Sequence, residues 1–220
     1  MNFQFHWHDG CSIDWVPGKV VCVGRNYADH AEELNNPVPD TPLLFIKPAT
    51  TLVPLSDPIR IPQHQGEVHF ETELAVLVGQ TLTNASAQQV RNAIAGVGLA
   101  LDLTLRDLQS QLKADGHPWE RAKAFDGACP LSGFIPLQES DDLQDLTFSL
   151  SVDGEQRQSG QTRDMIVPVV DLLMHISQTF TLQTGDVVLT GTPAGVGALR
   201  SGQTLVLDLE GRIRLTTQIL

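Results

Sequence analysis

The chain has 220 residues, 41% hydrophobic and 18% charged, which is typical of a globular protein large enough to bury a substantial core. Its formal net charge of −12 argues against a nucleic acid or an anionic membrane surface as the main partner. The three cysteines are an odd number without metal-ligand spacing, which favours a reduced compartment. The sequence has neither a signal-like N-terminus nor an apolar run of the ~18 residues that a membrane span needs, so we expect a cytoplasmic protein.

The N-terminal part predicts short strands and one short helix. Residues 3–15 alternate aromatic side chains around a His-Asp-Gly turn and predict a hairpin, so residues 1–18 are expected to form a small β appendage. Residues 26–34 predict a short helix with Asn26 or Asp29 near its cap. The other elements expected here are a buried strand at 19–24, a loop at 35–41, an apolar strand at 43–46 and an irregular β-rich arm at 51–66.

Residues 69–79 are the most informative segment, because acidic residues run directly into an apolar strand that ends at a glycine. Residues two apart share a face of a strand, so Glu71 and Glu73 lie side by side where the strand enters the core. Two such carboxylates need a shared proton, a basic partner or a divalent cation, and oxygen-only ligands favour Mg²⁺, Mn²⁺ or Ca²⁺. A solvent-facing acidic edge strand is the alternative that this segment alone leaves open.

The following segments predict two helices and then a series of strands. Ser86 is the expected N-cap of the first helix, and Thr104, three residues before Asp107, that of the second. The expected elements are helices at 86–95, 104–113 and 166–180, strands at 96–101, 146–152, 185–190, 204–209 and 213–217, and hairpin turns at 153–154 and 210–211. We predict one α+β domain, mainly β, built around a β-roll or barrel-like sheet with three or four inserted helices.

Three polar residues near position 102 could extend an acidic metal site. Asp102 ends the expected strand at 96–101, where a rigid element would hold a third carboxylate in an accessible place; taken alone, it is better explained as a helix cap. Arg106 and Gln109 lie three apart on the next helix and share a face. They could receive a substrate carboxylate and carbonyl, although Arg106 could equally be a surface residue paired with Asp107.

Three more residues are candidates for proton transfer and charge stabilisation. His30 and Glu33 have the i, i+3 spacing at which a carboxylate can hold one imidazole nitrogen and leave the other as a base that activates water. Lys123 lies among small residues and could stabilise charge in a cleft. A surface histidine and a surface lysine are the ordinary alternatives. In the Gly/Pro turn at 189–197, Thr192 and nearby backbone amides could bind a carboxylate.

Several of these segments together resemble the fumarylacetoacetate hydrolase family in its short, single-domain form. The matching segments are Gly-Arg-Asn-Tyr-Ala-Asp-His at 24–30, Leu-Phe-Ile-Lys-Pro at 44–48, Val-His-Phe-Glu-Thr-Glu-Leu at 68–74, Asp102 with Arg106-Asp107, Pro118-Trp119 with Ala122-Lys123, and Leu-Thr-Gly-Thr-Pro-Ala-Gly-Val-Gly at 189–197. They follow the family's order and cover most of the chain from residue 19, so we expect residues 19–220 to form the catalytic domain.

The resemblance implies a role for each candidate and a homodimer of a β-rich fold. It implies that Glu71, Glu73 and Asp102 bind Mg²⁺ or Mn²⁺ and that His30 and Glu33 activate water. The residues implied to lie around a bound 2-oxo acid are Arg25, Arg106, Gln109, Lys123 and Thr192.

The reaction expected from the resemblance is C–C hydrolysis of an acylpyruvate-like β-diketo acid through a metal-stabilised enolate. The alternatives on the same site are an oxaloacetate decarboxylase or tautomerase and a 2-hydroxymuconate-type isomerase, because the outcome depends on substrate shape and on water near the cleaved carbon. A non-catalytic metal-binding β domain would keep the carboxylates but would need neither His30 nor Lys123.

Overall fold

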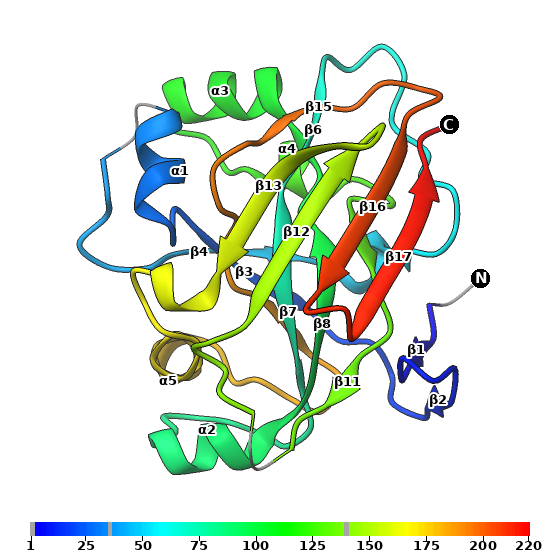
Figure 1. Cartoon of the computed structure of the whole chain (residues 1–220). Coiled ribbons are helices and arrows are strands. Elements are labelled where there is room, and N and C mark those ends of the chain that lie inside the picture. Colours follow the sequence, from blue (N-terminus) through cyan, green and yellow to red (C-terminus); the bar gives the residue numbers. More distant parts are fainter. Residues whose placement is uncertain (1–2, 35–36, 139–140) are drawn as a thin grey trace.

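A mixed sheet that curls into a half-barrel forms the centre of the fold (Figure 1). The computed structural model describes residues 3–34, 37–138 and 141–220. Residues 1–2 of the expected appendage and 35–36 of the expected loop lie outside the described residues. The sheet has the order β4-β3-β14-β7-β8-β10-β5, with β11 also paired to β8. Its strands are β3 (Val20–Gly24), β4 (Leu43–Lys47), β5 (Leu52–Pro54), β7 (Thr72–Val78), β8 (Ile94–Leu101), β10 (Cys129–Leu131), β11 (Ile135–Pro136) and β14 (Val187–Leu189).

A second, antiparallel sheet crosses one face of β7 and β8 (Figure 1). Its order is β13 (Glu155–Gln161), β12 (Thr147–Val152), β16 (Thr204–Leu209) and β17 (Ile213–Gln218). Alternate residues of β12 and β16 are buried, as expected for strands with one face on a core, and they share a cluster with β7 and β8 that includes Phe148, Leu207, Leu74 and Leu99. Both predicted hairpin turns are confirmed, since Asp153, Gly154, Glu210 and Gly211 all have positive φ.

Two helices pack together at one end of this core: α2 (Ala87–Ala93) and α5 (Val169–Thr179) (Figure 1). Ser86 and Gln89 form a reciprocal capping box at the start of α2, which confirms the predicted N-cap. The apolar face of α5 is wholly buried in the same cluster as the two sheets. In the described part of the chain, no helix is both long and apolar enough to cross a membrane.

The N-terminal hairpin packs on the other face of the central sheet. Strands β1 (Phe5–His6) and β2 (Ser12–Ile13) pair antiparallel, which confirms the hairpin expected at 3–15. Phe5 and Ile13 are buried there beside side chains of β3 and β14. The amide of His8 donates to Phe134 O at 2.8 Å, and the amide of Phe134 donates to His6 O at 3.0 Å. The apolar side chains of the hairpin therefore complete one layer of the core.

A third group of short elements gathers where β7 begins and β8 ends. It contains β6 (Val68–Phe70), β9 (Thr104–Leu105), β15 (Gly197–Ala198), α1 (Ala28–Glu33), α3 (Arg106–Ala114) and α4 (Glu120–Lys123); two 3₁₀ turns span Ala49–Thr51 and Thr162–Asp164. The mainly β fold with a few inserted helices is the predicted class.

Thr104 is not the helix cap that was expected, and Asn26, expected near the cap of α1, bonds to distant segments instead of capping it. Thr104 does not cap a helix, because residues 104–105 pair with β6 and its hydroxyl donates to Asp102 O at 3.0 Å, so α3 begins at Arg106. Asn26 does not cap α1, because its side-chain amide bonds to Val167 and Thr190 instead. Tyr27 is the N-cap of α1, so Asn26 and Asp29 both lie near the cap, as expected. Tertiary partners outcompete the local capping pattern at the first two residues.

Candidate metal centre and active site

Three buried carboxylates meet where the two longest strands of the central sheet lie side by side. Glu71 occupies the break between β6 and β7, Glu73 is the second residue of β7, and Asp102 directly follows β8. Their exposed fractions are 5%, 1% and 1%, and one oxygen from each lies within 4.8 Å of the others. The helix-cap alternative for Asp102 is wrong, because its side chain points into this cluster and binds two lysines. The structure thus brings together the three predicted metal ligands.

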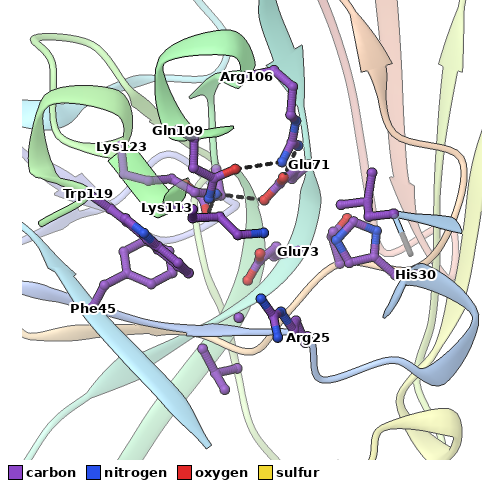
Figure 2. Close-up of a pocket in the computed structure, with 15 residues that line it drawn as sticks. Arg25, His30, Phe45, Glu71, Glu73, Arg106, Gln109, Lys113, Trp119 and Lys123 are labelled. Carbon is purple, nitrogen blue, oxygen red and sulfur yellow. Dashed lines mark hydrogen bonds and ion pairs between the residues drawn. The ribbon is translucent and has the colours of Figure 1, made fainter. Parts of the chain in front are cut away.

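Basic groups contact two of the three carboxylates directly. Lys123 Nζ donates to Glu71 Oε2 at 2.7 Å and to Asp102 Oδ2 at 2.6 Å. Arg106 Nη2 pairs with Glu71 Oε1, and its Nη1 donates to Gln109 Oε1 at 2.8 Å (Figure 2). Arg106 and Gln109 therefore share the face of α3 that was predicted, and Lys123 is a buried residue of the cluster, not a surface lysine.

Lys47 is a further buried cation that the sequence analysis did not single out. Its Nζ lies 2.8 Å from Asp102 Oδ1 and donates to the carbonyls of Leu103, Ala128 and Lys123. The sequence feature that could have identified Lys47 as a buried cation is its position at the end of the apolar strand at 43–47. A lysine that continues such a strand must place its charge among partners inside the protein.

The third carboxylate is electrostatically different from the other two. Glu73 Oε2 accepts a hydrogen bond from the Gly191 amide at 2.6 Å. Burial and the nearby charges of Asp102 and Glu71 raise the pKa of Glu73 well above its usual range. Burial alone would also raise the pKa of Glu71, but Lys123 and Arg106 outweigh it and hold that pKa below its usual range.

This donor set fits a hard divalent cation. Three carboxylates offer oxygen ligands only, and a cation bound between them would offset the burial and the charges of Asp102 and Glu71 that raise the pKa of Glu73. Glu71, Glu73 and Asp102 would hold the ion, and Lys47 would orient Asp102 from behind.

His30 and Glu33 form the pair that their spacing predicted. His30 Nδ1 lies 3.4 Å from Glu33 Oε2, and the His30 side chain is only 7% exposed. The Gly195 amide donates to both Glu33 oxygens, at 3.1 and 3.2 Å, and so ties α1 to the Gly/Pro turn. Burial lowers the pKa of His30, although Glu71 and Glu33 oppose this effect. A lowered pKa favours the neutral imidazole that a proton acceptor needs.

Thr192 is held beside the predicted metal ligands by a buried glutamine that the sequence analysis missed. Thr192 Oγ1 donates to Thr72 O at 2.8 Å and accepts from Gln158 Nε2 at 2.8 Å. Gln158, on β13, also donates to Pro193 O and accepts from the amide of Thr72. No local pattern marks Gln158, because its partners lie on two other segments of the chain.

One pocket contains nearly all of these groups (Figure 2). Its walls include every predicted site residue except Glu33, which reaches it through His30: Arg25, His30, Glu71, Glu73, Asp102, Arg106, Gln109, Lys123 and Thr192. Phe45, Lys113 and Trp119 also line the pocket and were not predicted. Lys123 Nζ lies 5.1 Å from the centre of the Phe45 ring, so the face of this aromatic ring covers the cation.

Comparison with known proteins gives consistent matches over almost the whole chain. The family model described as "Fumarylacetoacetate (FAA) hydrolase C-terminal" matches residues 19–220. An oxaloacetate tautomerase of Escherichia coli is 55% identical over 219 residues, which cover 99% of this chain and 100% of that protein. A mitochondrial oxaloacetate decarboxylase of Dictyostelium discoideum is 42% identical over 199 residues, 90% of this chain and 91% of that protein.

A solved structure adds a relative whose name states another reaction. The structure of fumarylpyruvate hydrolase from Pseudomonas aeruginosa in complex with Mn²⁺ and pyruvate is 33% identical, has a TM-score of 0.91, and covers 100% of this chain and 96% of that one. A homologue therefore binds Mn²⁺. The relatives fit the expected alternative, oxaloacetate tautomerisation or decarboxylation, better than C–C hydrolysis, which they do not specifically support. The spacing of His30 and Glu33 predicted a proton acceptor, but it did not specify whether water or a substrate carbon is the proton donor.

Proposed function

Because the chain belongs to the fumarylacetoacetate hydrolase family, we propose that it is a metal-dependent tautomerase that interconverts the enol and keto forms of oxaloacetate. The observation that carries this proposal is a buried imidazole, paired with Glu33, in the same pocket as three carboxylates suited to Mg²⁺ or Mn²⁺. The 55% identity to a named oxaloacetate tautomerase supports this reaction over the others in the family.

The reaction moves one proton between the enol oxygen on C2 and the carbon C3. When bound, a divalent cation would hold the carboxylate and the C2 oxygen of the substrate and withdraw electrons from C2, which makes a proton on C3 more acidic. Glu33 accepts a hydrogen bond from His30 Nδ1, which leaves Nε2 as the nitrogen that can take the proton from the enol oxygen and deliver it to C3, or carry it back. The Gly195 amide holds Glu33 in place for this task.

Lys123 and Arg106 serve as fixed positive charges in this scheme. Burial works against the charge of Lys123, but Asp102 and Glu71 raise its pKa above the usual range, so it stays protonated and acts by charge instead of as a base. Arg106 and Gln109 stand together at the pocket wall, where they can orient a substrate carboxylate.

C–C hydrolysis of an acylpyruvate is the second candidate. The hydrogen-bonded chain from the Gly195 amide through Glu33 to His30 favours it, because such a chain can also activate water. The homodimer and the cytoplasmic location remain predictions.

The test follows the decay of enol-rich oxaloacetate by its absorbance, after metal removal with EDTA and after addition of Mg²⁺ or Mn²⁺. We expect decay that needs both protein and metal, a loss of about 10²-fold in His30→Ala, and loss of metal dependence in Asp102→Asn. Pyruvate release and acetylpyruvate loss are measured in parallel. Decay no faster than that with metal alone would refute the tautomerase, and faster acetylpyruvate cleavage would favour the hydrolase.

A further inference from the structure

We propose that Arg25 and Lys113 form a subsite for a second carboxylate, so that the pocket selects 2-oxo dicarboxylates over 2-oxo monocarboxylates. This inference rests on the proposed function, because it assumes that the 2-oxo carboxylate end of the ligand binds at the acidic cluster. The resemblance assigned no role to Lys113, and it placed Arg25 near the substrate without saying which part of the substrate it meets.

The two cations reach the same part of the pocket from different elements. Arg25 directly follows β3 and precedes α1, and Lys113 lies in the last turn of α3. Both line the pocket, and Figure 2 shows the ends of their side chains directed toward its interior. Arg25 has φ of 61°, a left-handed conformation that is uncommon for residues other than glycine and that often occurs at functional sites.

Their position differs from that of the other two cations of the pocket. Lys123 and Arg106 are bound to Glu71 at the buried end. Arg25 donates through Nη1 to a neutral carbonyl, Pro37 O, at 3.1 Å, so this contact leaves its charge unbalanced. Lys113 is exposed at the rim of the pocket.

Electrostatics at the rim favour an anion. Partial burial lowers the pKa of Lys113, and the positive charges of Arg25 and Arg106 add to this effect. The like charges of Arg25 and Lys113 repel each other across the opening, and a carboxylate placed between them relieves that repulsion. A ligand whose 2-oxo carboxylate end lies on the buried cluster directs its other end toward this rim. A distal carboxylate would gain charge-assisted hydrogen bonds there, whereas a neutral acyl group would not.

The experiment compares two stable ligands of equal chain length, 2-oxoglutarate and 2-oxovalerate, which differ only in the distal carboxylate. Calorimetric titration of the Mn²⁺-loaded protein should show at least ~10-fold tighter binding of 2-oxoglutarate in the wild type. Lys113→Met should weaken 2-oxoglutarate ~10-fold and leave 2-oxovalerate and oxalate unchanged. Lys113→Arg should restore the preference, and Arg121→Met, which removes an exposed charge outside the pocket lining, should change nothing.

The same variants give a kinetic readout. In Lys113→Met, the KM for oxaloacetate should rise ~10-fold with kcat little changed, because the proton-transfer groups are untouched. Equal weakening of both ligands by Lys113→Met, or weakening of neither, would overturn the subsite. The titrations need no turnover, so a protein that prefers 2-oxoglutarate but leaves enol-oxaloacetate unchanged would retain the subsite and lose the proposed reaction.

Discussion

Replacement of Gln158 by leucine should destabilise the protein and loosen the metal site together. The side chain is 1% exposed, and its amide accepts from Thr72 N at 3.0 Å and donates to Pro193 O at 2.9 Å. Leucine has a similar size but leaves these two buried backbone groups without their partner. Each unsatisfied group costs about 1–3 kcal/mol, so Gln158→Leu should lower the free energy of unfolding by about 2–6 kcal/mol. That is a large part of the ~5–15 kcal/mol that stabilises a typical domain.

The proposed metal site should be affected because Thr72 lies between Glu71 and Glu73, two of its expected ligands. The hydrogen bond from the Thr72 amide fixes the backbone at the start of β7, so Mn²⁺ should bind about 10-fold more weakly in Gln158→Leu. Urea unfolding in EDTA measures the stability, and calorimetric titration measures the Mn²⁺ affinity. Gln156→Leu, at an exposed position of the same strand, is the control and should change stability by less than ~0.5 kcal/mol. A Gln158→Leu protein within ~1 kcal/mol of wild type would refute the reasoning.

Three further predictions concern the Gly/Pro turn, the proton acceptor and the thiols. Gly195→Ala should cost at least ~2 kcal/mol of unfolding free energy more than Gly202→Ala, because both have positive φ but only at Gly195 would the added carbon clash with a backbone carbonyl, Arg157 O; equal losses in urea unfolding would contradict this. Burial lowers the pKa of His30 and Glu33 raises it, so Glu33→Gln should lower that pKa further; a rise in the titration of the ring proton signals of metal-free protein would contradict this. The unfolded chain binds a proton on His30 more readily than the folded protein does. The contribution of neutral His30 to the free energy of unfolding is therefore present above pH ~6.5 and is lost as the pH falls below that value. Cys11 is exposed and should react with a thiol reagent in the native protein, whereas the two buried cysteines should react only after unfolding; a colorimetric titration with more than one rapid thiol would contradict this.

Local chemistry in the sequence was enough to predict the parts of this protein whose causes are local. The capping box at Ser86 depends on two residues three apart, and the turns at 153–154 and 210–211 depend on residues that tolerate positive φ. Glu71 and Glu73 were identified because carboxylates that lead into an apolar strand must be balanced by a proton or a cation. His30 and Glu33 contact each other because their spacing places them on one helical face.

Only the tertiary structure showed which distant groups complete the site. Lys47, Gln158 and Gly191 contact segments that are 50 or more residues away in the sequence, and no local pattern specifies such partners. The same cause moved the start of α3 from Thr104 to Arg106, since pairing with β6 outcompeted the cap. A residue's hydrogen-bonding needs can be read from its own chemistry, but the group that satisfies them is decided by how strands and helices pack, because buried polar groups take whichever partner the completed core brings within reach.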